Sequence, residues 1–111
     1  MAYDADLADR IRELLLLEPD VIERRMFGGI VFLIGGHIAV GVSGSGGLLM
    51  RSEREDTEEL LSQPHVEPFV MRGRALRGWV RVGEEAVAED GELNRWVEAG
   101  VGFARSLPPS A

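Results

Sequence analysis

The chain contains neither cysteine nor lysine, so all twelve of its basic residues are arginines. Without cysteine, disulfides and thiolate metal sites are excluded, and a cytoplasmic location is expected. Without lysine, a phosphate-binding loop and Schiff-base chemistry are excluded as well. The longest apolar runs are four or five residues, far short of the roughly 20 that a membrane span needs. No membrane partner is therefore expected.

Acidic residues outnumber basic ones, and the formal net charge is −7 over 111 residues. This length suits one globular domain, which we place at residues 1–107, and a hydrophobic share of 45% is ordinary for such a domain. Residues 108–111 are expected to form a disordered tail. Because nucleic-acid affinity comes mainly from neutralised phosphates, the acidic balance disfavours nucleic acid as a partner.

The amino-terminal part predicts one helix. Asp4 is a suitable N-cap, and Pro19 disfavours helical geometry before it, so the helix should stop near Leu17. Between these positions an apolar stripe has helical spacing and should face the core. Its members are Leu7, Ile11, Leu14 and Leu15.

The central part changes to a strand period. Residues 21–27 are expected to be extended, and strands are predicted over 30–34, 37–42 and 48–51. Gly35 and Gly36 supply a hairpin turn, and the glycine-rich stretch 43–47 supplies a loop. Alternation in the second of these strands puts Ile38, Val40 and Val42 on one face.

The remaining part predicts a helix, a hairpin and a last helix. Ser52 and Glu55 form a capping-box pattern for a short helix to about Ser62. A hairpin follows over 69–72 and 78–82, and Asp90 should cap a final helix with Leu93, Trp96, Val97, Val101 and Ala104 on its apolar face. Gly100 and Gly102 either permit close packing there or let the helix end fray. The order α-β-β-β-α-β-β-α predicts a two-layer α+β fold, an antiparallel sheet with helices on one face.

No residue pattern predicts catalysis. His37 and His65 are the only histidines, and their spacing suggests no metal site. Ser43 and Ser45 lack the second glycine of a nucleophile elbow, and the acidic pairs fall on polar helix positions. We therefore assign no catalytic, cofactor-binding or metal-binding residue and expect no enzyme. A buried pocket that contains a desolvated carboxylate would instead indicate an enzyme.

The hairpin 69–82 carries the candidate interaction residues. If Phe69, Met71, Val80 and Val82 face the core, alternation places Arg72, Arg74, Trp79 and Arg81 on the opposite face. Three readings are open: a solvated face whose arginines pair with glutamates, a surface for protein binding or self-association, or a nucleic-acid contact. Exposed tryptophan and arginine are typical anchors of protein interfaces.

A run near the amino end, Arg25-Met26-Phe27-Gly28-Gly29, resembles the signature of the N-terminal domain of TfoX/Sxy-type regulators. The segments Pro68-Phe69 and Gly78-Trp79-Val80-Arg81-Val82, with Leu93 and Trp96-Val97, resemble that family too. The resemblance implies an α+β fold like that of type III secretion chaperones, and a bacterial role in regulating competence and transcription. It implies no catalytic residues.

The signature residues Arg25, Met26, Phe27, Gly28 and Gly29 are assigned to structure. Phe27 should anchor the core, and the two glycines should permit close backbone approach or positive φ. The predicted function is a non-enzymatic regulatory domain that binds a protein partner or a second copy of itself. The alternative is direct nucleic-acid binding through the Arg72–Arg81 hairpin.

Overall fold

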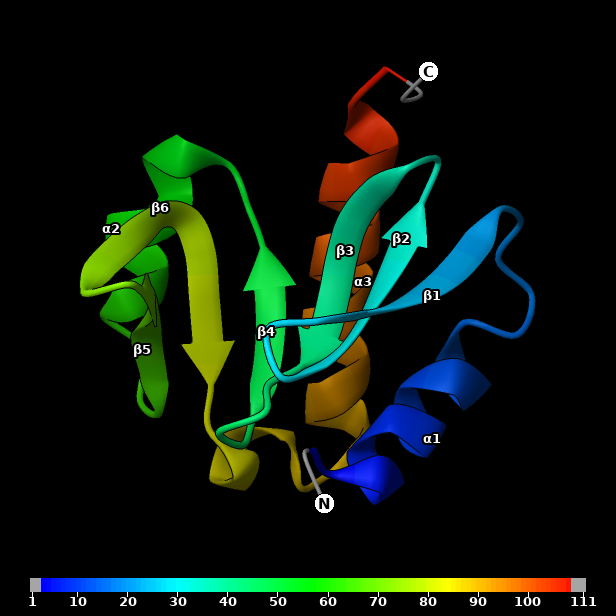
Figure 1. Cartoon of the computed structure of the whole chain (residues 1–111), viewed down its shortest axis with the longest axis horizontal. Coiled ribbons are helices and arrows are strands. Elements are labelled where there is room, and N and C mark those ends of the chain that lie inside the picture. The colour runs from blue at the N-terminus through cyan, green and yellow to red at the C-terminus, as the bar shows by residue number, and fades with distance from the viewer. Residues whose placement is uncertain (1–2, 109–111) are drawn as a thin grey trace.

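A computed structural model describes residues 3–108. Within these residues the elements are α1 (Ala5–Leu14), β1 (Val21–Met26), β2 (Gly29–Ile34), β3 (His37–Val42), β4 (Leu48–Arg51), the 3-10 helix η1 (Arg54–Asp56), α2 (Thr57–Leu61), β5 (Val66–Met71), β6 (Arg74–Val82), the 3-10 helix η2 (Glu84–Val87) and α3 (Asp90–Ser106). All the strands form one antiparallel sheet in the order β1-β2-β3-β4-β6-β5 (Figure 1). None of the helices described is long and apolar enough to cross a bilayer.

The predicted α+β class is confirmed, but the predicted order lacked one strand. All but the last residue of the predicted extended segment 21–27 forms the edge strand β1, paired with β2 from Val21↔Ile34 to Met26↔Gly29. Its middle is Glu23-Arg24-Arg25, which is exposed. An edge strand with charged residues shows no apolar alternation, and such charges discourage pairing with other chains.

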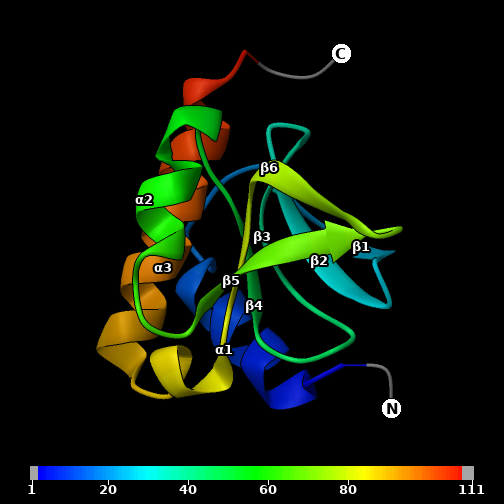
Figure 2. The ribbon, with the colours of Figure 1, turned by 90° about the vertical axis from the view of Figure 1, so that its left-hand side faces the viewer.

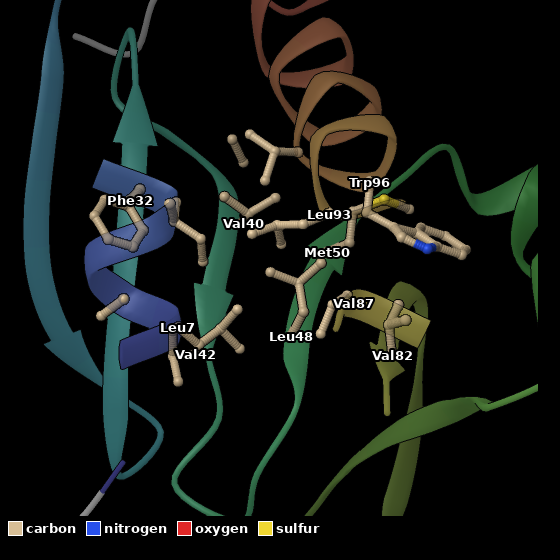
Figure 3. Close-up of a cluster of buried hydrophobic side chains, with 14 of the residues drawn as sticks. Leu7, Phe32, Val40, Val42, Leu48, Met50, Val82, Val87, Leu93 and Trp96 are labelled. Atoms are coloured by element: carbon tan, nitrogen blue, oxygen red, sulfur yellow. The ribbon is translucent and has the colours of Figure 1, made fainter. Parts of the chain in front are cut away.

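The main core lies between the sheet and the helices, which cover one face (Figure 2). In Figure 3, Leu93 and Trp96 of α3 lie over Val40 and Met50 of the central strands. α1 contributes Leu7 and Ile11 to the same cluster, and α2 adds Leu60 and Leu61 at its margin. Burying each large apolar side chain contributes about 1.5–3 kcal/mol, so packing holds the short helices in place.

The first helix begins as predicted and ends earlier. Leu7 N donates to Asp4 Oδ1 over 3.1 Å, so Asp4 is the N-cap. The helix ends at Leu14, with Leu15 as its C-cap, rather than near Leu17. Leu15 is buried, whereas Leu14 is 38% and Leu17 98% exposed, so Leu14 does not belong to the predicted buried stripe.

The Asp4 cap gives a first testable prediction. Asp4→Ala should lower the free energy of unfolding by about 1 kcal/mol, because Leu7 N–H loses its acceptor. Asp6→Ala, in the same turn, is the matched control, since the carboxylate of Asp6 accepts no hydrogen bond within residues 3–108. Urea unfolding measures both variants. Equal losses would contradict the assignment of Asp4 as the cap.

A β-bulge changes the predicted faces of β3. The register moves from Phe32↔Val40 to Leu33↔Ile38, which leaves Ala39 unpaired. Ala39 and Val40 both join the helix-side core, while Ile38 lies outside that cluster. The prediction that Ile38 shares a face with Val40 is therefore wrong, because an extra residue breaks the two-residue period.

Both predicted helix caps in the second half differ from the structure. Ser52 Oγ donates to the Glu53 carbonyl rather than capping a helix, and the 3-10 helix η1 precedes α2. Asp90 is the first residue of α3, with Glu89 at its N-cap. The Asp90 carboxylate instead pairs with Arg10 over 3.0 Å. The predicted end of α2 ahead of Pro64 is confirmed.

α3 packs closely on β3 through Gly100. A Cβ at this position would lie 2.5 Å from the Ala39 carbonyl oxygen and 2.6 Å from Val40 Cγ1. A Cβ at Gly102 would meet nothing within 4 Å. Of the two predicted alternatives, close packing therefore holds for Gly100, and α3 continues to Ser106.

The predicted tail is described only at its first residue. His37 Nε2 lies 2.6 Å from the Pro108 carbonyl oxygen, which can accept a hydrogen bond from the ring. The rest of the tail, residues 109–111, lies outside the described residues. Because Pro108 follows Leu107, the C-cap of α3, this contact ties the chain just after that helix to the start of β3.

Candidate interaction surface

The tip of the β5–β6 hairpin presents two of the predicted residues. Met71 pairs with Arg74, and the turn between them uses positive φ at Arg72 (51°) and Gly73 (77°). Such a turn matches the right-handed twist of the two strands. Arg72 and Arg74 are exposed, and no carboxylate within residues 3–108 pairs with either of them.

Trp79 and Arg81 lie on the predicted face of β6. Val80 and Val82 belong to the helix-side core, so Trp79 and Arg81, which alternate with them along the strand, point to the opposite face. The prediction that Phe69 faces the helix-side core is wrong, because Pro68 pairs with Val80 on that side and alternation turns Phe69 to the opposite face. As a result Phe69 lies beside Trp79, with ring centroids 5.8 Å apart.

Arg81 is bound within the protein. Its Nη1 donates to the Gly46 carbonyl over 2.8 Å, and its Nη2 pairs with Glu67 over 3.0 Å. Arg81 therefore connects β6 to the β3–β4 loop and to β5. The structure thus brings Trp79 and Arg81 to one face, and leaves Arg72 and Arg74 together at the hairpin tip.

The signature run forms the turn between β1 and β2. Phe27 and Gly28 have positive φ of 58° and 73°, in a two-residue hairpin between Met26 and Gly29. A Cβ on Gly29 would overlap the Val42 carbonyl oxygen. This geometry supplies both the positive φ and the close approach that the two glycines predicted. Of the flanking residues, Arg25 is exposed and Met26 is half-buried.

Phe27 joins the two ends of the curled sheet. The β1–β2 hairpin crosses in front of β3 toward β4 and β6 (Figure 1). There the Phe27 ring meets Phe69 edge-on at 5.2 Å and Trp79 at 5.8 Å between centroids. On the same face of the sheet, away from the helices, Val31 and Leu49 are fully buried. Phe27 thus anchors this second cluster, outside the helix-side core that sequence reasoning had assigned to it.

Sequence reasoning missed Arg51, at the end of β4. Its guanidinium carbon lies 5.5 Å from the ring centroid of Trp79 and 5.5 Å from that of Phe103. Beside it is a hollow of about 340 Å³, to which Arg54 and Arg77 also contribute. Alternation after Leu49 could have placed Arg51 on this face. Its proximity to Trp79 depends on β4 pairing with β6, which no local pattern indicates.

The histidines and the loop serines, the other candidates for catalysis or metal binding, do not form a common site. His65 Nδ1 lies 3.9 Å from Glu85 Oε1 at the surface. Ser43 Oγ accepts a hydrogen bond from Ser45 N over 3.1 Å, within a turn. Within residues 3–108, no three histidine or acidic side chains are grouped in a way that could hold a metal ion.

Two other polar contacts are structural. Hydrogen bonding to Glu23 raises the pKa of Arg12 above its ordinary value, in an exposed contact between α1 and β1. Gly78 N donates to the buried Thr57 Oγ1 over 2.8 Å, a tie between α2 and β6 that sequence reasoning missed. Both contacts hold secondary-structure elements together.

Comparisons with known proteins identify the family. Neither the comparison with curated proteins nor the one with solved structures gives a match. The model of the family described as the TfoX N-terminal domain matches residues 13–104. That range holds every strand of the sheet and nearly all of α3. The chain therefore belongs to the TfoX N-terminal domain family and is a competence-regulator-like domain.

Proposed function

We propose that this chain is a cytoplasmic, non-enzymatic regulatory domain that acts by binding another protein or a second copy of itself. The contact would be made by the tip of the β5–β6 hairpin. The observation that carries this is the pair Arg72 and Arg74, exposed and without a carboxylate partner within residues 3–108. Membership of a family of regulatory domains supports it.

Only some of the arginines are in ion pairs. Acidic residues outnumber arginines, 19 to 12, and some arginines pair with them, as Arg10 does with Asp90 and Arg105 with Glu18. Within residues 3–108, Arg72 and Arg74 make no such pair, which is also true of several other arginines, and these two stand together at the tip of a hairpin. An arginine kept free in this way can give its charge-assisted hydrogen bonds to a partner.

The four predicted contact residues divide into two roles under this proposal. Arg72 and Arg74 would touch the partner. Trp79 and Arg81 would hold the hairpin, because Trp79 is half-buried against two aromatic rings and Arg81 is paired with Glu67. A double substitution at Trp79 and Arg81 should therefore lower stability as well as binding, so it is a poor test of the contact.

Charge reversal at the tip tests the proposal. Arg72→Glu with Arg74→Glu should abolish capture of a partner from the native cell, or self-association in sedimentation, and leave thermal unfolding unchanged. The matched control is Arg24→Glu with Arg25→Glu, an exposed pair on β1 without ion-pair partners within residues 3–108. Equal capture and sedimentation for the wild type and both variants would contradict the proposal.

Direct nucleic-acid binding is the alternative function for the same hairpin. It predicts a mobility shift at low salt that weakens steeply as salt rises, because phosphate contacts release counterions. The net charge of −7 opposes it. No shift at low salt would eliminate nucleic-acid binding, whereas a salt-sensitive shift lost in the Arg72/Arg74 variant would replace the protein-binding proposal.

A further inference from the structure

We infer that the hollow beside Arg51 receives a carboxylate side chain, with an adjacent apolar residue, from an acidic peptide segment of the partner. This rests on the proposed function and names the chemistry of the segment bound. The hollow measures about 340 Å³ and lies where the end of β4 meets β6 and the last turn of α3. Apolar groups from Trp79, Phe103 and Leu107 line one part of it, and arginines line another.

Arg51 is held in a defined position yet has no anionic partner. Its guanidinium lies near the rings of Trp79 and Phe103, at 5.5 Å from each centroid. It is half-buried, and it makes no ion pair or side-chain hydrogen bond within the part of the chain that the structure describes. A planar guanidinium fixed by aromatic contacts is well prepared to bind a carboxylate through two parallel hydrogen bonds. The cost of ordering this side chain is already met in the free protein.

The charge around the hollow favours a single carboxylate over a polyanion. Three arginines, Arg51, Arg54 and Arg77, line the hollow together with two glutamates, Glu53 and Glu55. The formal balance of these side chains, three positive and two negative, is one positive charge, which one carboxylate neutralises, whereas a run of phosphates would meet the repulsion of both glutamates. Trp79 is also edge-on to Phe27 and tilted against Phe69, so those neighbours restrict access for a stacking base.

A second hollow adjoins the first and suits the residue next to the bound carboxylate. It measures about 420 Å³, lies between α2 and α3 and shares Ser52, Glu53 and Phe103 with the first. Met50 and Leu60 give it apolar lining, and its acidic lining residues, Glu53, Asp56 and Glu59, disfavour a second carboxylate there. A peptide whose carboxylate lies on Arg51 can therefore lay a neighbouring apolar side chain against Phe103 or into this second hollow.

A peptide titration followed by NMR tests the inference. The probe is the peptide acetyl-Gly-Leu-Glu-Leu-Gly-amide, and its matched control has glutamine in place of glutamate. The chain has two tryptophans, so the indole N–H signals of Trp79 and Trp96 can be told apart with a Trp79→Phe variant. We expect a saturable shift of the Trp79 signal, an unmoved Trp96 signal, and binding at least about tenfold weaker for the glutamine peptide.

Two arginine variants complete the design. Arg51→Gln should weaken binding of the glutamate peptide by about tenfold or more. Arg95→Gln is the matched control, because Arg95 lies 4.8 Å over the other tryptophan, Trp96, away from the hollow, and it should bind as the wild type does. The wild-type comparison of the two peptides stands even if Arg51→Gln unfolds.

Several outcomes would overturn the inference. They are equal affinity for the two peptides, no saturable shift at Trp79, or a Trp79 shift caused only by a single-stranded oligodeoxynucleotide. Partner capture that depends on Arg72 and Arg74 would then leave the proposed function intact. If that capture also failed, the proposed function would fall with the inference.

Discussion

Replacing Gly100 with alanine is expected to lower the free energy of unfolding by about 2–3 kcal/mol, although alanine favours helices. The added Cβ would lie 2.5 Å from the backbone oxygen of Ala39 and 2.6 Å from Val40 Cγ1. A backbone oxygen in the middle of the sheet cannot move away without disturbing β3. The helix would therefore have to shift off the sheet, and overpacking of this kind outweighs the gain in helix propensity.

The same helix offers a matched control for this prediction. Gly102→Ala should raise the free energy of unfolding by up to about 1 kcal/mol, because its Cβ meets nothing within 4 Å and alanine is the better helix former. Denaturant unfolding of both variants gives the comparison. Changes of the same sign at the two positions would show that α3 does not pack on β3 as described.

The second large effect is expected at Phe27. Phe27→Ala should lower the free energy of unfolding by about 3 kcal/mol, the range for loss of a large aromatic side chain from a packed cluster. Its ring contacts both Phe69 and Trp79. These contacts hold the β1–β2 turn against the β5–β6 hairpin, and they offset the strain of a positive φ at a bulky residue. The Trp79 indole signal should also move.

Val70→Ala is the control for Phe27. Val70 is a large apolar residue on β5 that is 56% exposed, so its loss should cost less than about 0.5 kcal/mol. Urea unfolding and the Trp79 indole signal report on both variants. If Phe27→Ala behaved like Val70→Ala, the signature turn would not be what holds the curled sheet closed.

Local patterns in the sequence predicted most of the elements. Asp4, the Gly35–Gly36 turn and the apolar spacing of α3 each act over a few residues, and the structure agrees with them. Strand β1 was predicted only as extended chain, because the charged residues of an edge strand show no alternation. The caps at Ser52 and Asp90 were wrong, since their side chains bond elsewhere.

Long-range features could not be predicted in the same way. The Ala39 bulge and the shift after Pro68 each reverse the face of nearby residues, and a two-residue period cannot reveal either one. For the candidate surface, sequence alternation placed Trp79 and Arg81 together. It could not show that Phe27 would reach Trp79, or that Arg51 would lie beside it, because both contacts depend on the strand order and the curl of the sheet.

We propose that this domain works through an arginine-bearing surface rather than through reactive groups. The most direct measurement is calorimetric titration of the captured partner, or of a second copy, against the wild type and the Arg72→Glu, Arg74→Glu variant. The account predicts affinity at least about tenfold lower for the variant, with unchanged unfolding. Equal affinity for the two folded proteins would contradict it.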